Sequence, residues 1–297
     1  MISRQTPETI QAALARGTVL LAKSSDSPRL DAQLLLAHVL GKEPSWLVAH
    51  AESYLARMQA ERFTGLLAKR AAGTPVAHAI GMWSFYGRSF EVNESVLVPR
   101  PETEHLVEAA VAYLGRRLEA HAFTKHLFTL LDVGVGSGAI ACSIAAEFPT
   151  VVVDGTDVSE DAVKVAERNA RRFNVHGRCK FIVGDLTQPV SHKQYDAVIA
   201  NLPYVPSADV AALRGSDPDV ALDGGPDGLD HYRRLLPALP PVLKADYLVL
   251  LEAAPPTIRT LAELVHDALP DATVAIERDY GGRERYVAAS RERAATR

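Results

Sequence analysis

A predicted strand passes into a predicted helix through Leu131-Asp132-Val133-Gly134-Val135-Gly136-Ser137-Gly138-Ala139. The residues before Asp132 are apolar and suit a buried strand, and the mostly apolar stretch from Ala139 suits a helix. Glycines at alternate positions allow a tight turn and the close approach of a ligand to the backbone. The helix start offers unpaired N–H groups to such a ligand. The stretch therefore predicts a ligand-binding turn, but it does not identify the ligand, because dinucleotide-binding folds use a glycine-rich turn too.

The chain beyond this turn alternates between short apolar runs and helical stretches. Such alternation predicts an α/β fold with a parallel sheet that is covered by helices on both faces. The predicted strands are 127–133, 151–156, 181–183, 195–200 and 247–251, with a closing pair at 272–276 and 285–289, and the predicted helices are 139–147, 162–173, 229–239 and 257–268. Thr103 is a candidate N-cap for a further helix through Leu114.

The chain before the turn is organised differently. Residues 6–72 predict helices: one apolar stripe runs from Leu30 to Leu40 and ends at Gly41, Pro44 can begin the next helix, and a second stripe covers 55–67. After the break at Gly73-Thr74-Pro75, short strands are predicted at 76–80, 84–86 and 90–92, with a hairpin turn at Gly87-Arg88. We therefore predict a small helical domain over 1–73, a linker hairpin over 74–98 and the α/β domain over 99–297.

The composition is ordinary for a soluble globular protein: of 297 residues, 47% are hydrophobic and 23% are charged, and the net charge is −4. The weak acidity gives no indication of a nucleic-acid binder. The N-terminus does not resemble a signal peptide, and no apolar run approaches the roughly 20 residues of a membrane span, so a cytoplasmic protein is expected. Neither Cys142 and Cys179 nor the ten histidines have metal-site spacing, so we expect buried cysteines and no metal.

Acidic residues follow the next two predicted strands. Asp157 lies 19 residues past Gly138 and could accept hydrogen bonds from both hydroxyls of a ribose. Asp185 could accept from an adenine amino group, and Leu186 could pack on the ring. The carboxyl ends of parallel strands share one edge of the sheet, and the glycine spacing is not G-x-G-x-x-G, so the set favours the nucleoside of S-adenosylmethionine, which has no pyrophosphate. Each aspartate alone could equally be a helix N-cap or a solvated loop acid.

The fourth strand of the α/β part runs directly into Asn201-Leu202-Pro203-Tyr204. In isolation such a tetrapeptide could be a mere turn. After a strand of a cofactor-binding sheet, it is suited to methylation of a planar nitrogen, whose delocalised lone pair must be aimed at the methyl group. The Asn201 side-chain oxygen and the Leu202 carbonyl can each accept one N–H, Pro203 fixes the chain direction, and Tyr204 can stack on the flat group. Catalysis is then positioning plus electrostatic stabilisation.

Several stretches together resemble the bacterial release factor glutamine methyltransferases, the PrmC or HemK family. The likeness covers nearly the whole chain, and its most specific parts are the linker and a later loop. The matching stretches are Asp132 to Gly138, Val96-Leu97-Val98-Pro99-Arg100-Pro101-Glu102-Thr103-Glu104, Asn201 to Tyr204 (N-P-P-Y in the family) and Ala221-Leu222-Asp223-Gly224-Gly225-Pro226-Asp227-Gly228-Leu229. Without the resemblance, Glu102 and Glu104 are interpreted as first-turn helix acids.

The resemblance implies a seven-stranded Rossmann-like class I methyltransferase domain and a helical domain that helps to hold the substrate. It implies methyl transfer from S-adenosylmethionine to the glutamine amide in the Gly-Gly-Gln loop of class I peptide chain release factors. We separately expect a monomer that binds no nucleic acid directly and no membrane. The implied catalytic residues are Asn201, Leu202, Pro203 and Tyr204. The implied cofactor residues are Asp132, Gly134, Val135, Gly136, Ser137, Gly138, Asp157, Val158, Asp185, Leu186 and Asn201.

Two departures from the family pattern keep alternatives open. Leu202 stands where the family usually has proline, although its proposed role belongs to a carbonyl that leucine also has. Ala253-Ala254-Pro255-Pro256 stands where the strand through Glu252 usually continues into a glycine and a glutamine. The alternatives are a paralogue with another glutamine-bearing substrate, an rRNA adenine-N6 methyltransferase, some of which carry N-L-P-Y, and a binding module that has lost catalysis.

Overall fold

The computed structural model describes residues 7–120, 127–213 and 217–292. The chain divides into two compact units, Met1–Met82 and Trp83–Arg297. No helix within the described ranges is both long and apolar enough to cross a membrane.

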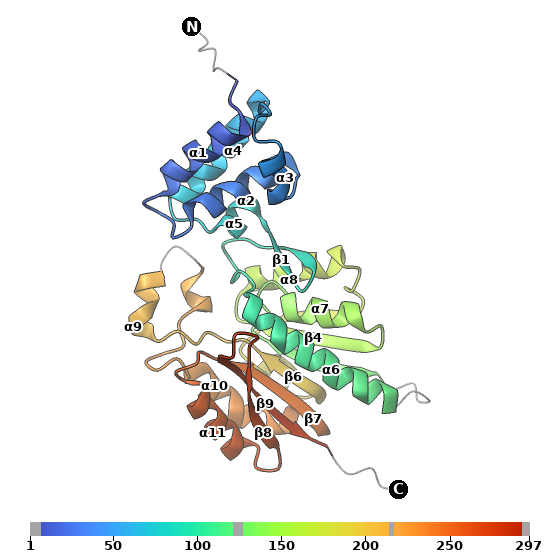
Figure 1. Cartoon of the computed structure of the whole chain (residues 1–297). Helices are drawn as coiled ribbons and strands as arrows, with labels where there is room; N and C mark the ends of the chain where they lie inside the picture. Colours follow the sequence, from blue (N-terminus) through green and yellow to red (C-terminus); the bar gives the residue numbers. More distant parts are fainter. Residues whose placement is uncertain (1–6, 121–126, 214–216, 293–297) are drawn as a thin grey trace. The chain divides into compact units, whose positions relative to one another are not determined.

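The first unit is helical, as predicted (Figure 1). Gly41 ends the second helix in the left-handed conformation (φ +63°), and Pro44 begins the third. Phe63 and Leu67 are buried on the fourth helix, but Met58 of the predicted second stripe is 73% exposed and Leu55 precedes the helix. The helices are α1 (Ile10–Leu21), α2 (Pro28–Leu40), α3 (Pro44–Ala49), α4 (Arg57–Ala71) and α5 (Val76–Ile80).

The prediction of a strand over 76–80 was wrong, because these residues form α5. Five apolar residues suit either element, and here Val76, Ala77 and Ala79 are buried on a short helix that Gly81 ends at φ +81°. The other two predicted strands form a hairpin of β1 (Met82–Phe85) and β2 (Arg88–Glu91). Its turn is Tyr86-Gly87 and not Gly87-Arg88, with φ of +48° and +67°, the geometry that suits the twist of a two-residue hairpin.

The second unit contains a seven-stranded sheet in the order β5-β4-β3-β6-β7-β9-β8, which confirms the predicted Rossmann-like fold. The first five strands in this order pair in parallel, and β9 pairs antiparallel with both β7 and β8. The direction of strand order reverses between β3 and β6, which is where open α/β sheets bind ligands. The strands are β3 (Phe128–Val133), β4 (Val151–Asp157), β5 (Cys179–Val183), β6 (Tyr195–Ala200), β7 (Leu243–Glu252), β8 (Thr273–Arg278) and β9 (Glu284–Arg291).

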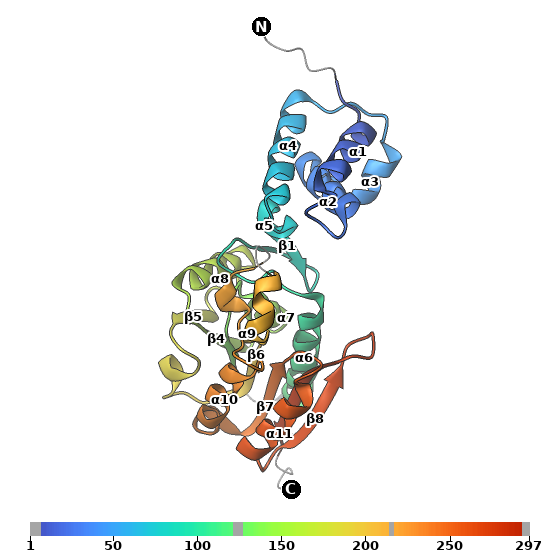
Figure 2. The same ribbon diagram turned by 90° about the vertical axis from the view of Figure 1, so that its left-hand side faces the viewer.

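Helices cover both faces of this sheet (Figures 1 and 2). The predicted helix over 229–239 breaks after Leu235, because Pro237 and Pro240 cannot donate helical hydrogen bonds. The α-helices are α6 (Glu104–Ala120), α7 (Ala139–Glu147), α8 (Glu160–Arg172), α9 (Ser207–Val210), α10 (Asp230–Leu235) and α11 (Ile258–Ala268). Short 3-10 helices are η1 (Pro101–Thr103), η2 (Gln188–Val190), η3 (Ala211–Leu213), η4 (Asp219–Ala221), η5 (Leu236–Ala238) and η6 (Pro240–Val242).

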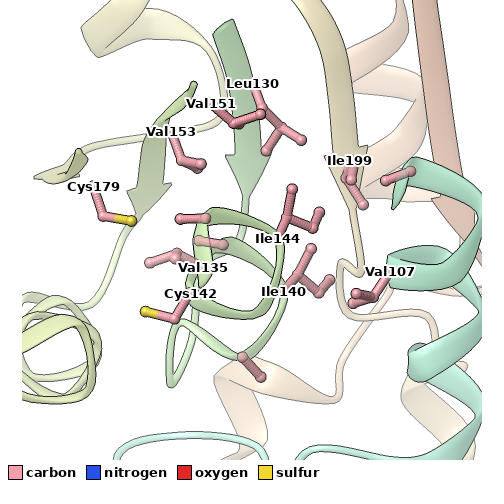
Figure 3. Packing of buried hydrophobic residues seen from close by; sticks show 14 of the residues in the cluster. Val107, Leu130, Val135, Ile140, Cys142, Ile144, Val151, Val153, Cys179 and Ile199 are labelled. Atoms are coloured by element: carbon pink, nitrogen blue, oxygen red, sulfur yellow. The ribbon is translucent and has the colours of Figure 1, made fainter. Parts of the chain in front are cut away.

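The two faces of the sheet carry separate apolar cores. Figure 3 shows Ile140 and Ile144 of α7 lying among Val107 of α6, Leu130 of β3 and Ile199 of β6. Cys142 and Cys179 are buried in this same core as free thiols, which confirms their interpretation as small buried apolar residues. The other core packs α10 and α11 against β6 and β7. Because α7 is buried along its whole inner side, the glycine turn before it is held firmly at the end of β3.

Candidate active site

A cavity of about 1100 Å³, its open mouth included, lies at the carboxyl ends of β3, β4, β5 and β6. Most of the residues that the sequence predicted line it, whereas Asp132, Gly138 and Tyr204 do not. The predicted residues that line the cavity are Gly134, Val135, Gly136, Ser137, Asp157, Val158, Asp185, Leu186, Asn201, Leu202 and Pro203. Topology therefore gathers, at one edge of the sheet, side chains that are far apart in the sequence.

The glycine turn requires glycine at its three glycine positions. The φ angles of Gly134, Gly136 and Gly138 are +78°, +52° and +77°, a region that favours glycine. A Cβ at Gly134 would also lie 2.9 Å from Leu202 Cδ2, and one at Gly138 would lie 3.1 Å from the Cβ of Ala166. The turn thus packs against both the segment after β6 and helix α8 while its backbone faces the cavity.

Asp132 lies behind the turn and not in the cavity. Its side chain is buried, and Oδ2 accepts the N–H of Ala141 in the first turn of α7 at 3.0 Å. Within the described residues Oδ1 has no hydrogen-bond partner. Burial raises the pKa of Asp132 well above its usual value. The observed contact of Asp132 therefore fixes the helix that follows the turn.

Asp157 ends β4 and joins the turn to the start of α8. One carboxylate oxygen accepts the N–H of Gly136 and the other accepts the N–H of Ser159, both at 2.9 Å. Ser159 itself is the N-cap, since its hydroxyl accepts the N–H of Ala162, so the interpretation of Asp157 as the cap of α8 was wrong. Burial raises the pKa of Asp157, and the two N–H bonds oppose the rise. Each oxygen can still accept a hydrogen bond from a ligand.

The third strand end contributes Asp185 and Leu186. Leu186 adopts φ +47° and packs against the apolar core under α10. Asp185 forms an ion pair with Arg234 of α10, which also lines the cavity and which the sequence did not single out. Val158, directly after β4, is 57% exposed and offers an apolar surface to a ligand.

Asn201 follows β6 with a fixed amide orientation. Its Nδ2 donates to the Thr103 hydroxyl at 3.0 Å, and within the described residues its Oδ1 makes no hydrogen bond. Thr103, the candidate N-cap, is the last residue of η1 and directly precedes α6, and the helix extends beyond the predicted Leu114 to Ala120. Leu202 is 5% exposed, packs on Gly134, and donates its N–H to the hydroxyl of Tyr232 at 3.3 Å.

Tyr204 is held from two sides. Its hydroxyl donates to Glu252 Oε1 at 3.2 Å, and burial, followed by the charge of Glu252, raises the pKa of Tyr204. The loop over 221–229 packs on its backbone, and a Cβ at Gly228 would lie 2.3 Å from the Tyr204 carbonyl oxygen. The next residue, Val205, exchanges backbone hydrogen bonds with Leu222 and Gly224 of that loop. Two sequence motifs thus form one structural unit.

Comparison with known proteins identifies the family. The model described as "PrmC N-terminal domain" matches residues 12–81, and the model described as "Methyltransferase small domain" matches residues 108–213. The release factor glutamine methyltransferase of Moorella thermoacetica is 36% identical over 281 residues, which cover 93% of this chain and 96% of that protein. The chain belongs to the release factor glutamine methyltransferase family.

A second relative gives the same result. The release factor glutamine methyltransferase of Cereibacter sphaeroides is 36% identical over 286 residues, covering 95% of this chain and 97% of the relative. Among solved structures, a putative S-adenosylmethionine-dependent methyltransferase from Streptococcus mutans superimposes with a TM-score of 0.50 at 11% identity, covering 70% of this chain and 55% of that one. This structural likeness shows the methyltransferase fold alone.

The family's linker signature forms part of the cavity wall, through Val96, Leu97, Pro99, Arg100 and Thr103. The sequence marked this stretch as a signature without giving it a place in the site. Its position is fixed by Asp217, which accepts the N–H of Val98 at 2.9 Å and pairs with Arg100 at 2.5 Å. The ordered linker therefore closes one side of the cavity.

Both linker glutamates have partners in the fold. Glu104 stands in the first turn of α6, as predicted, and accepts the N–H of Tyr86 at 2.9 Å. Glu102 pairs with Arg285 of β9 at 3.1 Å. Within residues 7–120, 127–213 and 217–292, no three His, Cys, Asp or Glu side chains gather into a group that could hold a metal ion.

The residues around the cavity fit S-adenosylmethionine, the cofactor of this methyltransferase family. The glycine turn brings bare backbone to the cavity wall, Asp157 has lone pairs to spare, and Val158 and Leu186, which follow Asp157 and Asp185 in the chain, provide apolar surface. When bound, this cofactor supplies an electrophilic methyl group. The chain's own residues must hold the acceptor.

Proposed function

We propose that this protein methylates the side-chain amide nitrogen of the glutamine in the Gly-Gly-Gln loop of class I peptide chain release factors, using S-adenosylmethionine. Membership of the release factor glutamine methyltransferases over more than nine-tenths of the chain supports the substrate. The observation that carries the chemistry is Asn201, whose Nδ2 is occupied by Thr103 while its Oδ1 is left to accept an N–H at the cavity wall.

The proposed acceptor site is a pair of hydrogen-bond acceptors. Asn201 Oδ1 accepts one amide N–H of the substrate, and the Leu202 carbonyl accepts the other. The Leu202 side chain is buried against Gly134, so leucine in place of proline leaves the carbonyl available to accept this N–H. Both acceptors stabilise the positive charge that develops on nitrogen, and holding the amide in place lowers the entropic part of the barrier. The proton can leave afterwards to water.

We assign supporting roles to the neighbouring residues. Pro203 fixes the chain direction, and Tyr204, whose hydroxyl is bound to Glu252, stacks on the flat amide when the substrate is bound. Asp157 accepts the ribose hydroxyls, Asp185 accepts the adenine amino group, and Val158 and Leu186 pack on the base. Gly134, Val135, Gly136 and Ser137 form the cradle. We further propose that the protein is cytoplasmic, is monomeric and does not bind nucleic acid directly.

Transfer of a labelled methyl group tests the proposal. Purified protein and labelled S-adenosylmethionine are expected to label a class I release factor, and Gln→Ala in its Gly-Gly-Gln loop is expected to abolish the labelling. Ribosomal RNA in the same assay tests the adenine alternative. Labelled RNA with an unlabelled release factor would overturn the assignment, and labelling of a different glutamine-bearing protein alone would indicate a paralogue.

A further inference from the structure

Glu252 is a buried charged residue that ends β7, directly after the apolar run Tyr247 to Leu251. It is 2% exposed and does not line the cavity. The parallel register of β6 and β7 pairs Ala200 with Leu251, so the residues that come next, Asn201 after β6 and Glu252 at the end of β7, lie side by side. Burying a carboxylate without partners is costly, which directs attention to what Glu252 contacts.

Several of its contacts lead toward the segment that follows β6. Glu252 Oε1 accepts the Tyr204 hydroxyl at 3.2 Å, whereas Oε2 is buried and has no hydrogen-bond partner among the described residues. The Thr103 hydroxyl lowers the pKa of the Glu252 carboxyl group, so it lies near this carboxylate. Thr103 in turn accepts from Asn201 Nδ2 at 3.0 Å. On the backbone side, the hydroxyl of Tyr232 donates to the Glu252 carbonyl and accepts the N–H of Leu202. Glu252 is therefore bonded directly to Tyr204 and, through Tyr232, to Leu202, and it lies near the Thr103 hydroxyl that holds Asn201.

The direction of these hydrogen bonds determines what Asn201 presents. An ionised carboxylate can only accept, and a threonine hydroxyl has a single proton to donate. Because Oε2 of Glu252 is buried and otherwise without a partner among the described residues, we assign the Thr103 proton to it, and Thr103 can then only accept from Asn201. Because the Thr103 hydroxyl accepts, the Nδ2 group of Asn201 turns toward Thr103 and its Oδ1 is left for the substrate. A rotated amide would instead present N–H groups to the N–H groups of the acceptor, which is unfavourable.

We propose that Glu252 and Thr103 are positioning residues that fix the amide orientation of Asn201, so that its oxygen faces the acceptor nitrogen. The inference rests on the proposed function only in naming the acceptor. The orientation itself follows from the three side chains.

The charges around Glu252 make this device depend on pH. Burial raises the pKa of Glu252 to about 7, the hydroxyls of Thr103 and Tyr204 and the guanidinium of Arg285 oppose the rise, and the charge of Glu102 adds to it. Tyr232 touches only the backbone carbonyl. Because the ionised form imposes the direction of the hydrogen bonds, kcat should rise as pH increases through about 7, as Glu252 ionises.

Paired substitutions at Thr103 test the chain of hydrogen bonds. Thr103→Val removes the hydroxyl at constant shape and is expected to lower kcat about 10-fold, the effect of one lost hydrogen bond in the transition state. The Kd of the cofactor, measured by calorimetry, should change much less. Thr103→Ser keeps the hydroxyl and should recover most of the loss. Equal kcat values for the Val and Ser variants would overturn the proposal.

The substitution Glu252→Gln removes the negative charge of the side chain but keeps its shape. Glutamine is neutral like the protonated acid and no longer imposes the direction of the hydrogen bonds, so kcat should stay near the low-pH value of the native protein and the rise in kcat through about pH 7 should disappear. A retained rise would contradict the role of Glu252. Where Glu252→Ala fails to fold, this conservative variant still decides the question.

A spectroscopic measurement does not need the substrate. The side-chain amide signals of Asn201, assigned by their loss in Asn201→Ala, should shift with an inflection near pH 7 in the native protein and not in Glu252→Gln. Unchanged signals across this range would overturn the inference. If the inflection is present but the release factor is not methylated, the proposed substrate fails and the positioning of Asn201 stands.

Discussion

Gly228 lies so close to Tyr204 that a Cβ on the glycine would be 2.3 Å from the tyrosine carbonyl oxygen. Gly228 also adopts φ +81°, so glycine is required both by its conformation and by its neighbour. This contact gives a physical reason why the family's sequence pattern includes both the loop over 221–229 and the segment Asn201 to Tyr204. The loop sets the position of the backbone that follows the proposed acceptor site.

Gly228→Ala is expected to damage both stability and activity. A matched control is Gly282→Ala, because Gly282 has nearly the same φ (+79°) but nothing within 4 Å of its added Cβ. The control should lose about 1 kcal/mol of unfolding free energy, the cost of the left-handed conformation alone. Gly228→Ala should lose about 3 kcal/mol and much of kcat, since the clash adds to the strain. Urea unfolding and methyl transfer measure both, and equal effects of the two substitutions would show that the contact does not matter.

Asn201→Ala should reduce turnover far more than cofactor binding. Removing one preorganised acceptor from a water-excluded site typically costs about 10²–10³ in kcat. The side chain lines the cavity, but its described hydrogen bond goes to Thr103. Single-turnover kinetics with a release factor, together with calorimetry of cofactor binding, separate the two effects. Near-normal turnover would exclude the paired-acceptor mechanism.

The sheet and the glycine turn could be predicted from the sequence because their signals are local. Apolar runs of strand length and glycines at alternate positions hardly depend on the rest of the fold. The run over 76–80 was misassigned because five apolar residues do not distinguish a strand from a short helix, and only burial against the other helices of the first unit decides.

The partners of the site residues were much harder to predict. Thr103 and Glu252 lie 98 and 51 residues from Asn201 in sequence, and only the order of strands brings the three together. The sequence indicated Thr103 only as a candidate N-cap. Glu252 did give a signal, because it is a charged residue that ends an apolar strand. Combined with the rule that parallel strands end at one edge, this signal could have placed Glu252 beside Asn201.

Asp185→Ala should weaken cofactor binding, and its partner provides the control. If Asp185 accepts the adenine amino group, its loss should raise the Kd about 10-fold, the effect of a hydrogen bond to a charged group. Arg234 is half-exposed, so its ion pair with Asp185 contributes little, and Arg234→Ala should change the Kd by less than about threefold. Calorimetry with S-adenosylhomocysteine measures both values. An unchanged Kd for Asp185→Ala would restore its interpretation as a solvated loop acid.

Glu252 should make the protein less stable as pH rises toward neutrality. Its pKa is about 7 in the folded protein against a usual 4.5, so the folded state holds this proton more tightly than the unfolded state does. The resulting stabilisation is fully present below about pH 4.5 and is lost as pH rises through about 7, a change of about 3 kcal/mol for this one group.

The difference in unfolding free energy between the native protein and Glu252→Gln isolates this group, because all other titrations cancel. Glutamine resembles the protonated acid, so the variant should gain about 3 kcal/mol relative to the native protein between about pH 4.5 and above 7. Parallel pH profiles from urea unfolding would mean that Glu252 is not perturbed. If the gain in stability coincides with the loss of the pH-dependent rise in kcat, the protein retains a costly buried carboxylate because its ionised form orients Asn201.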